Sequence, residues 1–139
     1  MAEQLCSFQL AGMTFGVPAV EVQEIMRAQP VTRVPLADPA TAGLMNLRGQ
    51  IVTTIDLRAR LGLVPRPAEE KPINVVIRTS EGLFSLLVDA IGDVVVPARE
   101  ILELIPENVP THFRDLIAGA YKLPDRLLFV LLLDRLVTH

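Results

Sequence analysis

The sequence predicts an all-β fold, built from two small antiparallel barrels that share apolar surface. Three observations indicate this. Most segments alternate apolar and polar residues or are rich in β-branched residues, as expected of strands. Turn residues recur at short spacing. The order hairpin, loop, glycine, hairpin occurs twice along the chain, so the halves resemble a repeat.

In the first half we expect two hairpins, a further short strand and one helical turn. The hairpins turn at Ala11-Gly12 and near Gly49. The helical turn at 58–61 is stopped by Gly62, which fits a C-terminal cap. The expected strands are Leu5–Leu10, Met13–Val17, Val31–Val34, Met45–Arg48 and Gln50–Leu57.

The pattern restarts after a proline-rich linker, Val64 to Pro72. A hairpin turns around Ser80-Glu81-Gly82, and a buried strand follows the turn Pro124-Asp125-Arg126. The strands expected here are Ile73–Thr79, Leu83–Asp89, Ile101–Leu104, Phe113–Ile117 and Leu128–Leu133.

Aligning the halves places Phe15–Ile25 over Phe84–Val94 and Gly43–Leu57 over Gly119–Leu133. This gives one domain over 1–139, with barrel one at about 13–63, the linker at 64–72 and barrel two at about 73–136. Exchange of the terminal strands between the barrels stays open. Neither barrel has enough interior alone, so the two should share apolar surface.

Composition excludes several classes of protein. The 139 residues carry a net charge of −3, with a pI of about 5.3 and 4% aromatic residues, which argues against nucleic acid as a partner. The longest apolar run, Leu127–Leu133, is too short for a membrane span of about 20 residues. The N-terminus lacks the pattern of a signal peptide. The single cysteine, Cys6, is expected to be a structural thiol, and the expected compartment is the cytoplasm.

The residues offer little chemistry. The only two histidines, His112 and His139, have no metal ligands at suitable spacing, and no phosphate-binding or dinucleotide motif is present. Asp56, Asp89 and Asp93 could form an acid–base pair, but carboxylates at strand ends are more often solvated or bonded to backbone amides. We therefore expect no enzyme activity, no metal and no cofactor.

Two charged residues need a separate account. Glu24 lies in the segment Val22-Gln23-Glu24-Ile25, which ends the first hairpin segment, and Arg48 stands at a turn. They are either unrelated surface charges or a pair across neighbouring strands that shapes an apolar groove. The pattern alone favours neither interpretation.

Six blocks of sequence resemble the CheW family of bacterial chemotaxis coupling proteins. The longest is NLRGQIVTTIDLRARLGL, which starts at Asn46, and the resemblance extends from Ser7 to Leu136. The other blocks, in family order, are FQLAGMTFGV, VQEI, TRVP, LLVDAIGDVV and KLPDRLLFVLLLDRLV, with Gly43 standing before NLRG.

The resemblance implies two five-stranded SH3-like barrels around a shared core, with few short helices. It also implies a non-enzymatic adaptor between the cytoplasmic tip of a chemoreceptor and the CheW-like domain of the histidine kinase CheA. Such a protein sits beside membrane-embedded receptor arrays without inserting into the membrane. A paralogue that serves twitching motility or development is the alternative, and the resemblance assigns no kinase-contact residues.

The resemblance also implies a receptor-binding groove, in which the arginine of NLRG approaches the glutamate of VQEI. Relatives often have proline where Thr53-Thr54 stand and glycine at Ser85, so these departures touch the groove. The expected groove residues are Val22, Glu24, Ile25, Gly43, Asn46, Arg48, Ser85 and Leu87.

Overall fold

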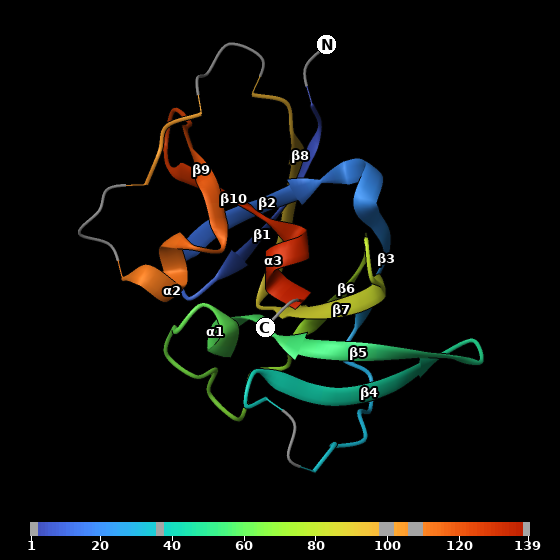
Figure 1. Ribbon diagram of the computed structural model, residues 1–139. Coiled ribbons are helices and arrows are strands. Elements are labelled where there is room, and N and C mark those ends of the chain that lie inside the picture. Colours follow the sequence, from blue (N-terminus) through green and yellow to red (C-terminus); the bar gives the residue numbers. More distant parts are fainter. Residues whose placement is uncertain (1–2, 36–37, 98–101, 106–109, 138–139) are drawn as a thin grey trace.

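The computed structural model describes residues 3–35, 38–97, 102–105 and 110–137. They form two five-stranded sheets, one above the other in the view of Figure 1. Sheet A has the order β8-β1-β2-β10-β9, and its strands are β1 (Leu5–Leu10), β2 (Met13–Pro18), β8 (Ala90–Val95), β9 (Ile117–Lys122) and β10 (Leu127–Leu131). Sheet B has the order β3-β6-β7-β5-β4, and its strands are β3 (Val22–Arg27), β4 (Thr41–Leu47), β5 (Gln50–Asp56), β6 (Ile73–Thr79) and β7 (Gly82–Val88).

The predicted fold class is confirmed: the chain is mostly β, and its two sheets fit two SH3-like subdomains. One detail differs from the expectation of antiparallel sheets. Each sheet contains one parallel pair, β2 with β10 in sheet A and β5 with β7 in sheet B. These pairs join strands that are far apart in the sequence, and every other pair is antiparallel.

The sheets do not divide the chain as the expected boundaries did. β2, expected in barrel one, lies in sheet A with β8, β9 and β10, whereas β6 and β7, expected in barrel two, lie in sheet B. The linker at 64–72 connects α1 to β6 within sheet B, so the prediction that it crosses between the barrels is wrong. The chain crosses at η1 (Ala19–Glu21) and at Asp89, between β7 and β8. The β1–β2 and β6–β7 hairpins each lie in a different sheet from the one expected. Both have tight local turns, and such a turn does not determine which sheet its hairpin joins.

Within the described residues, η1 and the helices α1 (Leu57–Arg60) and α2 (Thr111–Arg114) connect strands, and the helix α3 (Leu133–Val137) follows β10. Asp56 caps α1, where its Oδ1 accepts a hydrogen bond from the N–H of Ala59 at 3.4 Å. This agrees with the expectation that the segment after β5 is one helical turn. Gly62 follows with a φ of +73°, as a glycine cap requires.

Three expected strands differ from the structure. Residues 31–34 form only a bridge between Thr32 and Leu44. Phe113 lies in α2, because Pro110 has the φ that starts a helix, and β9 begins only at Ile117. Of Ile101–Leu104, residue 101 lies outside the described residues, and Glu103 forms a bridge with Ala120.

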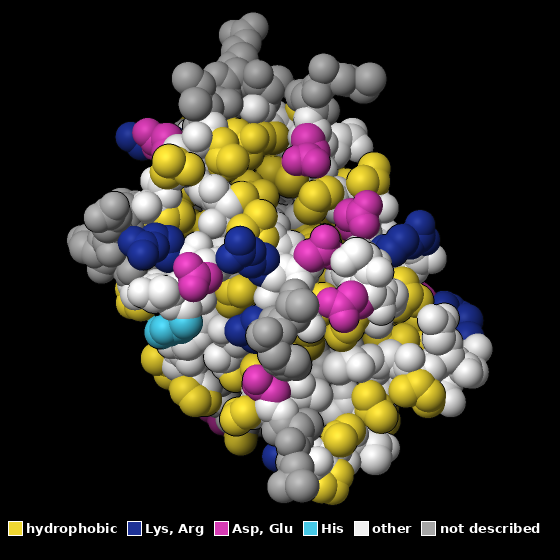
Figure 2. All heavy atoms as spheres, viewed as in Figure 1, with side chains coloured by type: hydrophobic (Ala, Val, Ile, Leu, Met, Phe, Trp, Pro, Cys, Tyr) yellow, Lys and Arg dark blue, Asp and Glu magenta, His cyan; other side chains and the backbone are white. Residues whose placement is uncertain are grey.

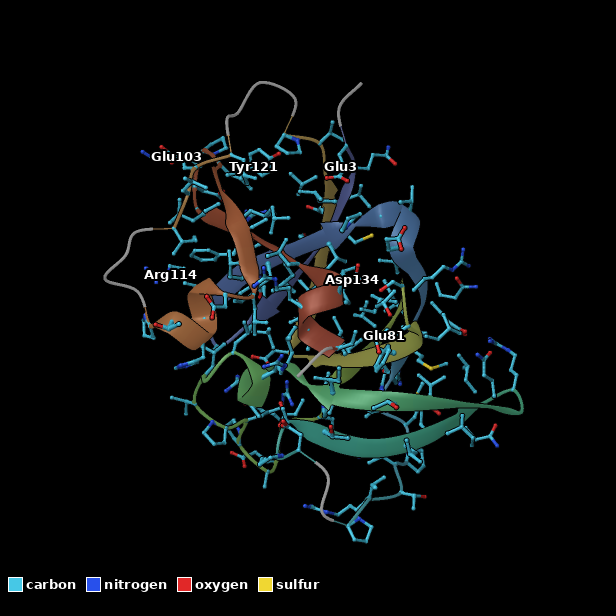
Figure 3. The ribbon with its side chains drawn as sticks, viewed as in Figure 1. Glu3, Glu81, Glu103, Arg114, Tyr121 and Asp134 are labelled. Carbon is cyan, nitrogen blue, oxygen red and sulfur yellow. The ribbon has the colours of Figure 1, made fainter. Side chains whose placement is uncertain are left out.

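The structure adds β3, β8 and α3 to the expected elements. Alternate residues of β3 are half-buried and exposed, as expected of an edge strand with one face toward the sheet interior. In α3, Asp134 accepts hydrogen bonds from the backbone N–H and the hydroxyl of Ser80, at 3.1 and 3.0 Å. Figure 3 shows Asp134 on α3 beside the β6–β7 turn that carries Glu81. α3 therefore connects the end of sheet A to a turn of sheet B.

The buried apolar side chains of the described residues form three clusters. The largest lies between the sheets and contains Phe8 and Phe15 from sheet A together with Val75 and Leu86 from sheet B. The second lies on the other face of sheet B and the third on the other face of sheet A. Shared apolar surface between the two halves was expected, and the largest cluster confirms it.

Candidate protein-binding site

Most of the predicted groove residues lie on the two edge strands of sheet B. Val22, Glu24 and Ile25 are on β3, and Gly43 and Asn46 are on β4. β3 and β4 stand at opposite ends of the strand order. Met26 of β3 nevertheless packs in the same cluster as Met45 of β4, so the sheet curls and brings its edges together.

Glu24 and Arg48 form a bidentate ion pair across these edges. Arg48 Nη1 donates to Glu24 Oε2 at 2.7 Å, and Nη2 donates to Oε1 at 2.5 Å. The hydrogen bonds and the positive charge of Arg48 lower the pKa of Glu24. The Glu24 side chain is 25% exposed and that of Arg48 is 71% exposed, so the pair faces solvent. The sequence left the pairing open, and the structure shows it.

The turn between β4 and β5 directs Arg48 toward β3. Arg48 has a φ of +51° and Gly49 a φ of +85°, as the two-residue turns of hairpins require. Asn46 Oδ1 accepts a hydrogen bond from the N–H of Gly49 at 2.8 Å. Asn46 thus supports the turn in which Arg48 adopts a backbone conformation that is uncommon for residues other than glycine.

Apolar side chains lie on the same edge strand as Glu24 and on the strand after the Arg48 turn. Ile25 is 44% exposed and Val22 is half-buried on β3, while Ile51 at the start of β5 is 60% exposed. Elsewhere on the molecule, Figure 2 shows hydrophobic side chains gathered over sheet A, in the upper part of the view. The surface at β3 therefore combines an apolar stretch with fixed, paired charges.

Gly43 has a structural reason to be glycine. Its φ is +152°, and a Cβ there would lie 2.4 Å from the carbonyl oxygen of Thr32. Thr32 and Leu44 exchange two backbone hydrogen bonds of 2.8 Å at this point. The lack of a side chain at Gly43 allows the segment after β3 to pass close to β4. Because Gly43 is buried, this packing role replaces the expected contact with a receptor.

Ser85 and Leu87 lie on the more central strand β7 instead of the edge strands, and Ser85 is not on the surface. Ser85 is completely buried on β7, opposite Thr54 and Val76, and Leu87 is half-buried opposite Asn74. The departures from the family pattern at Thr54 and Ser85 are therefore neighbours inside sheet B. Thr54 is also completely buried.

Sequence reasoning missed a cluster of charges at the crossing between the sheets. Asp89 accepts from Arg58 Nε at 3.1 Å and Nη2 at 2.5 Å, and from Arg66 Nε at 3.0 Å. It also accepts from the N–H of Ala11, in the β1–β2 turn, at 2.8 Å. Burial alone would raise the pKa of Asp89, but these hydrogen bonds outweigh it and lower the pKa below its ordinary value. A carboxylate with these partners is a structural anion.

The described residues show no other chemical centre. No group of three or more His, Cys, Asp or Glu side chains within the described ranges could hold a metal ion. None of the helices in that part of the chain has the length and apolar character of a membrane span. Cys6 is a free, half-buried thiol, and burial raises its pKa.

Comparisons with known proteins agree with this architecture. The family model of the CheW-like domain matches residues 4–139. A probable chemotaxis protein CheW from Rhizobium etli is 29% identical over 136 residues, which cover 98% of this chain and 88% of that protein. The chemotaxis protein CheW of Bacillus subtilis is 29% identical over 129 residues, covering 93% of this chain and 83% of that protein.

A solved structure has the same fold along the whole chain. The crystal structure of the scaffolding protein TtCheW from Thermoanaerobacter tengcongensis aligns with a TM-score of 0.88 and 25% sequence identity. The alignment covers 100% of this chain and 94% of that chain. Since the family model matches nearly every residue and the two sheets align along the whole chain, this protein belongs to the CheW-like domain family.

Proposed function

We propose that this protein is a non-enzymatic adaptor that couples chemoreceptors to the histidine kinase CheA in bacterial chemotaxis. Its partners would be the cytoplasmic tip of a methyl-accepting chemotaxis protein and the CheW-like regulatory domain of CheA. It would act in the cytoplasm, peripheral to membrane-embedded receptor arrays. Family membership over nearly the whole chain supports an adaptor, and similar proteins are named as chemotaxis and scaffolding proteins.

The observation that carries the receptor assignment is the ion pair between Glu24 and Arg48. It joins the two edge strands of sheet B beside Val22 and Ile25. An exposed apolar stretch held by fixed charges suits the apolar face of a helical partner, which is recognised through side chains repeating along one helix face.

The adaptor acts through binding and geometry. Its affinity for each partner depends on how the partner packs, so a change in the receptor's packing shifts the populations of the whole assembly. Glu24 is held by Arg48, and Asp89 is held by Arg58 and Arg66, so these carboxylates are engaged in ion pairs instead of standing ready for proton transfer. No chemical step on this chain is needed.

A paralogue that scaffolds a twitching or developmental pathway is the alternative function. The two functions use the same surfaces and differ in the identity of the receptor and kinase. Binding to each candidate kinase's CheW-like domain distinguishes them.

The test measures binding of the purified protein to a receptor-tip fragment and to the CheA C-terminal domain, by pull-down and then by calorimetry. Wild type should bind both, while Arg48→Ala should bind the receptor fragment more weakly with unchanged kinase affinity and melting temperature. Arg126→Ala is the matched control, because Arg126 also forms an exposed ion pair, with the adjacent Asp125. Equal loss of both partners in Arg48→Ala, or no binding by wild type, would refute the proposal.

A double-mutant cycle tests whether the pair acts as a unit. Losses of receptor affinity in Glu24→Ala and Arg48→Ala should be non-additive, because either change alone removes the same hydrogen bonds. Strictly additive losses would mean that the pair does not shape the receptor surface.

A further inference from the structure

Asn74 is a polar residue inside sheet B. It stands on β6 in the apolar run Ile73-Asn74-Val75-Val76-Ile77, and its exposed fraction is zero. A buried amide is costly unless its polar atoms have partners. The partners of Asn74 therefore indicate what the amide does there.

The Asn74 side chain contacts three other segments of the sheet. Its Oδ1 accepts a hydrogen bond from the N–H of Gln29 at 3.2 Å. Its Nδ2 donates to Ser85 Oγ at 2.8 Å and lies 3.6 Å from Met45 Sδ. Gln29 follows β3, Ser85 lies on β7 and Met45 lies on β4. One amide thus holds the end of one edge strand and contacts the other.

The two connections between the edges differ in exposure. The Glu24–Arg48 ion pair is on the surface, where Arg48 is 71% exposed. Water competes for such a pair and salt screens it. The Asn74 side chain is completely buried, so a lost partner leaves an unsatisfied polar group there, although Gln29 at the other end of one bond is exposed. The connection through Asn74 is therefore anchored at its buried end, whereas both ends of the ion pair face solvent.

We propose that Asn74 is a positioning residue for the receptor surface: by holding the backbone at Gln29, it fixes the end of β3 and with it the orientation of Glu24 and Ile25. This inference rests on the proposed function, since it assigns the residue that orients the same surface. Asn74 itself touches no partner.

The role of Ser85 follows from this geometry. Ser85 cannot contact a receptor, because it is completely buried. Its hydroxyl instead accepts the amide hydrogen of Asn74. Ser85 contributes to the stability of the amide network, while the bond from Gln29 to Asn74 carries the positioning.

The experiment compares Asn74→Leu with Ser85→Ala in the full-length protein. Asn74→Leu removes the acceptor of the Gln29 N–H, whereas Ser85→Ala removes only the oxygen acceptor of Asn74 Nδ2. Amide exchange at Gln29 is measured by NMR without any partner. Affinities for the receptor-tip fragment and for the CheA C-terminal domain are then measured by calorimetry.

Asn74→Leu should speed exchange at Gln29 and weaken receptor binding, each by about fivefold, the factor for one net hydrogen bond. Its kinase affinity should stay within about twofold of wild type, a change smaller than the loss of one such bond produces. Ser85→Ala should lower the melting temperature but keep both Gln29 protection and receptor affinity. Asn74→Asp should restore Gln29 protection, because a carboxylate oxygen can also accept this bond.

Several results would overturn the inference. A protected Gln29 amide in Asn74→Leu would do so whatever the receptor result. Unchanged receptor affinity with faster exchange would show that the bond does not orient the surface. If Asn74→Leu does not fold, Asn74→Ala provides the same comparison without filling the site. Failure of wild type to bind the receptor fragment overturns the proposed function, and the exchange data then still decide whether Asn74 holds Gln29.

Discussion

Replacing Asp89 with asparagine should destabilise the protein more than any change to a surface ion pair. Asp89 is the one residue between β7 of sheet B and β8 of sheet A. Its carboxylate accepts hydrogen bonds from Arg58 after β5, from Arg66 in the linker and from Ala11 in the β1–β2 turn. Asparagine keeps the size of the side chain and removes its charge.

The size of the effect follows from the burial of the arginines. The side chains of Arg58 and Arg66 are 8% and 9% exposed, and that of Asp89 is 22% exposed. Without the carboxylate, two nearly buried guanidinium groups lack their counter-ion, and breaking a buried pair in this way costs about 3–5 kcal/mol. Solvent reaches part of Asp89, so we expect about 3 kcal/mol. In a domain of this size that is a fall in melting temperature of roughly 10 °C.

The assay is urea unfolding at pH 7 followed by circular dichroism, for wild type, Asp89→Asn and a control. Asp125→Asn is the control, because Asp125 pairs with Arg126 while its side chain is 73% exposed. Its loss should cost under about 1 kcal/mol. If Asp89→Asn costs no more than Asp125→Asn, the charge cluster does not hold the two sheets, and the reasoning fails.

Three further predictions concern acid, glycine and thiol chemistry. The pKa of Asp89 is lowered in the folded protein. Its contribution to the free energy of unfolding is therefore present above the unfolded pKa of about 3.9 and is lost as pH falls through the folded pKa. The stability difference between wild type and Asp89→Asn should accordingly shrink in urea titrations below about pH 4. Gly43→Ala should cost about 2–4 kcal/mol, since its Cβ would meet Thr32 backbone and its φ is unfavourable. Gly49→Ala, which has open space around it, should cost about 1 kcal/mol in the same denaturation assay. Burial raises the pKa of Cys6, so a thiol-specific reagent at pH 7 should label it more slowly in the native protein than in urea; equal rates would contradict a protected thiol.

The hairpins were readable from the sequence because their determinants are local. Ala11-Gly12 and Gly49 provide the positive φ values that tight turns need. Gly62 ends a helical turn for the same reason. In each case the residue type limits the backbone directly, so no knowledge of distant contacts is required.

The assignment of hairpins to sheets could not be read in this way. β2 pairs with β10 and β5 pairs with β7, in parallel pairs between strands that are distant in the sequence. Alternation of apolar and polar residues indicates that a strand has a buried face, but it does not identify the neighbouring strand with which it pairs. A repeat in sequence order therefore predicts a division of the chain at its middle, whereas the structure places β1 and β2 in one sheet with β8, β9 and β10.

The candidate site shows the same limit at the level of single residues. Glu24 and Arg48 were singled out because charged residues in an otherwise apolar pattern need an explanation, and the structure pairs them. Ser85 was placed on the surface because it interrupts a family pattern, although it is buried. Asn74 offered the better signal, one amide within a run of β-branched residues, because such a residue must find partners once the strand is buried.

Asp89 illustrates why a carboxylate's role depends on contacts that the sequence does not display. In the sequence it was one of three acids that could take part in proton transfer. Its donors come from positions 11, 58 and 66, and only the packing of the two sheets brings them together. A general acid or base needs a proton that moves near neutral pH, whereas these donors stabilise the ionised form. The same hydrogen bonds connect the turn of sheet A, the helical turn of sheet B and the linker, so the charge fixes the junction between the sheets. The proposed adaptor function, with surfaces for two partners, would depend on such a junction, because the packing of the two sheets fixes how those surfaces are placed.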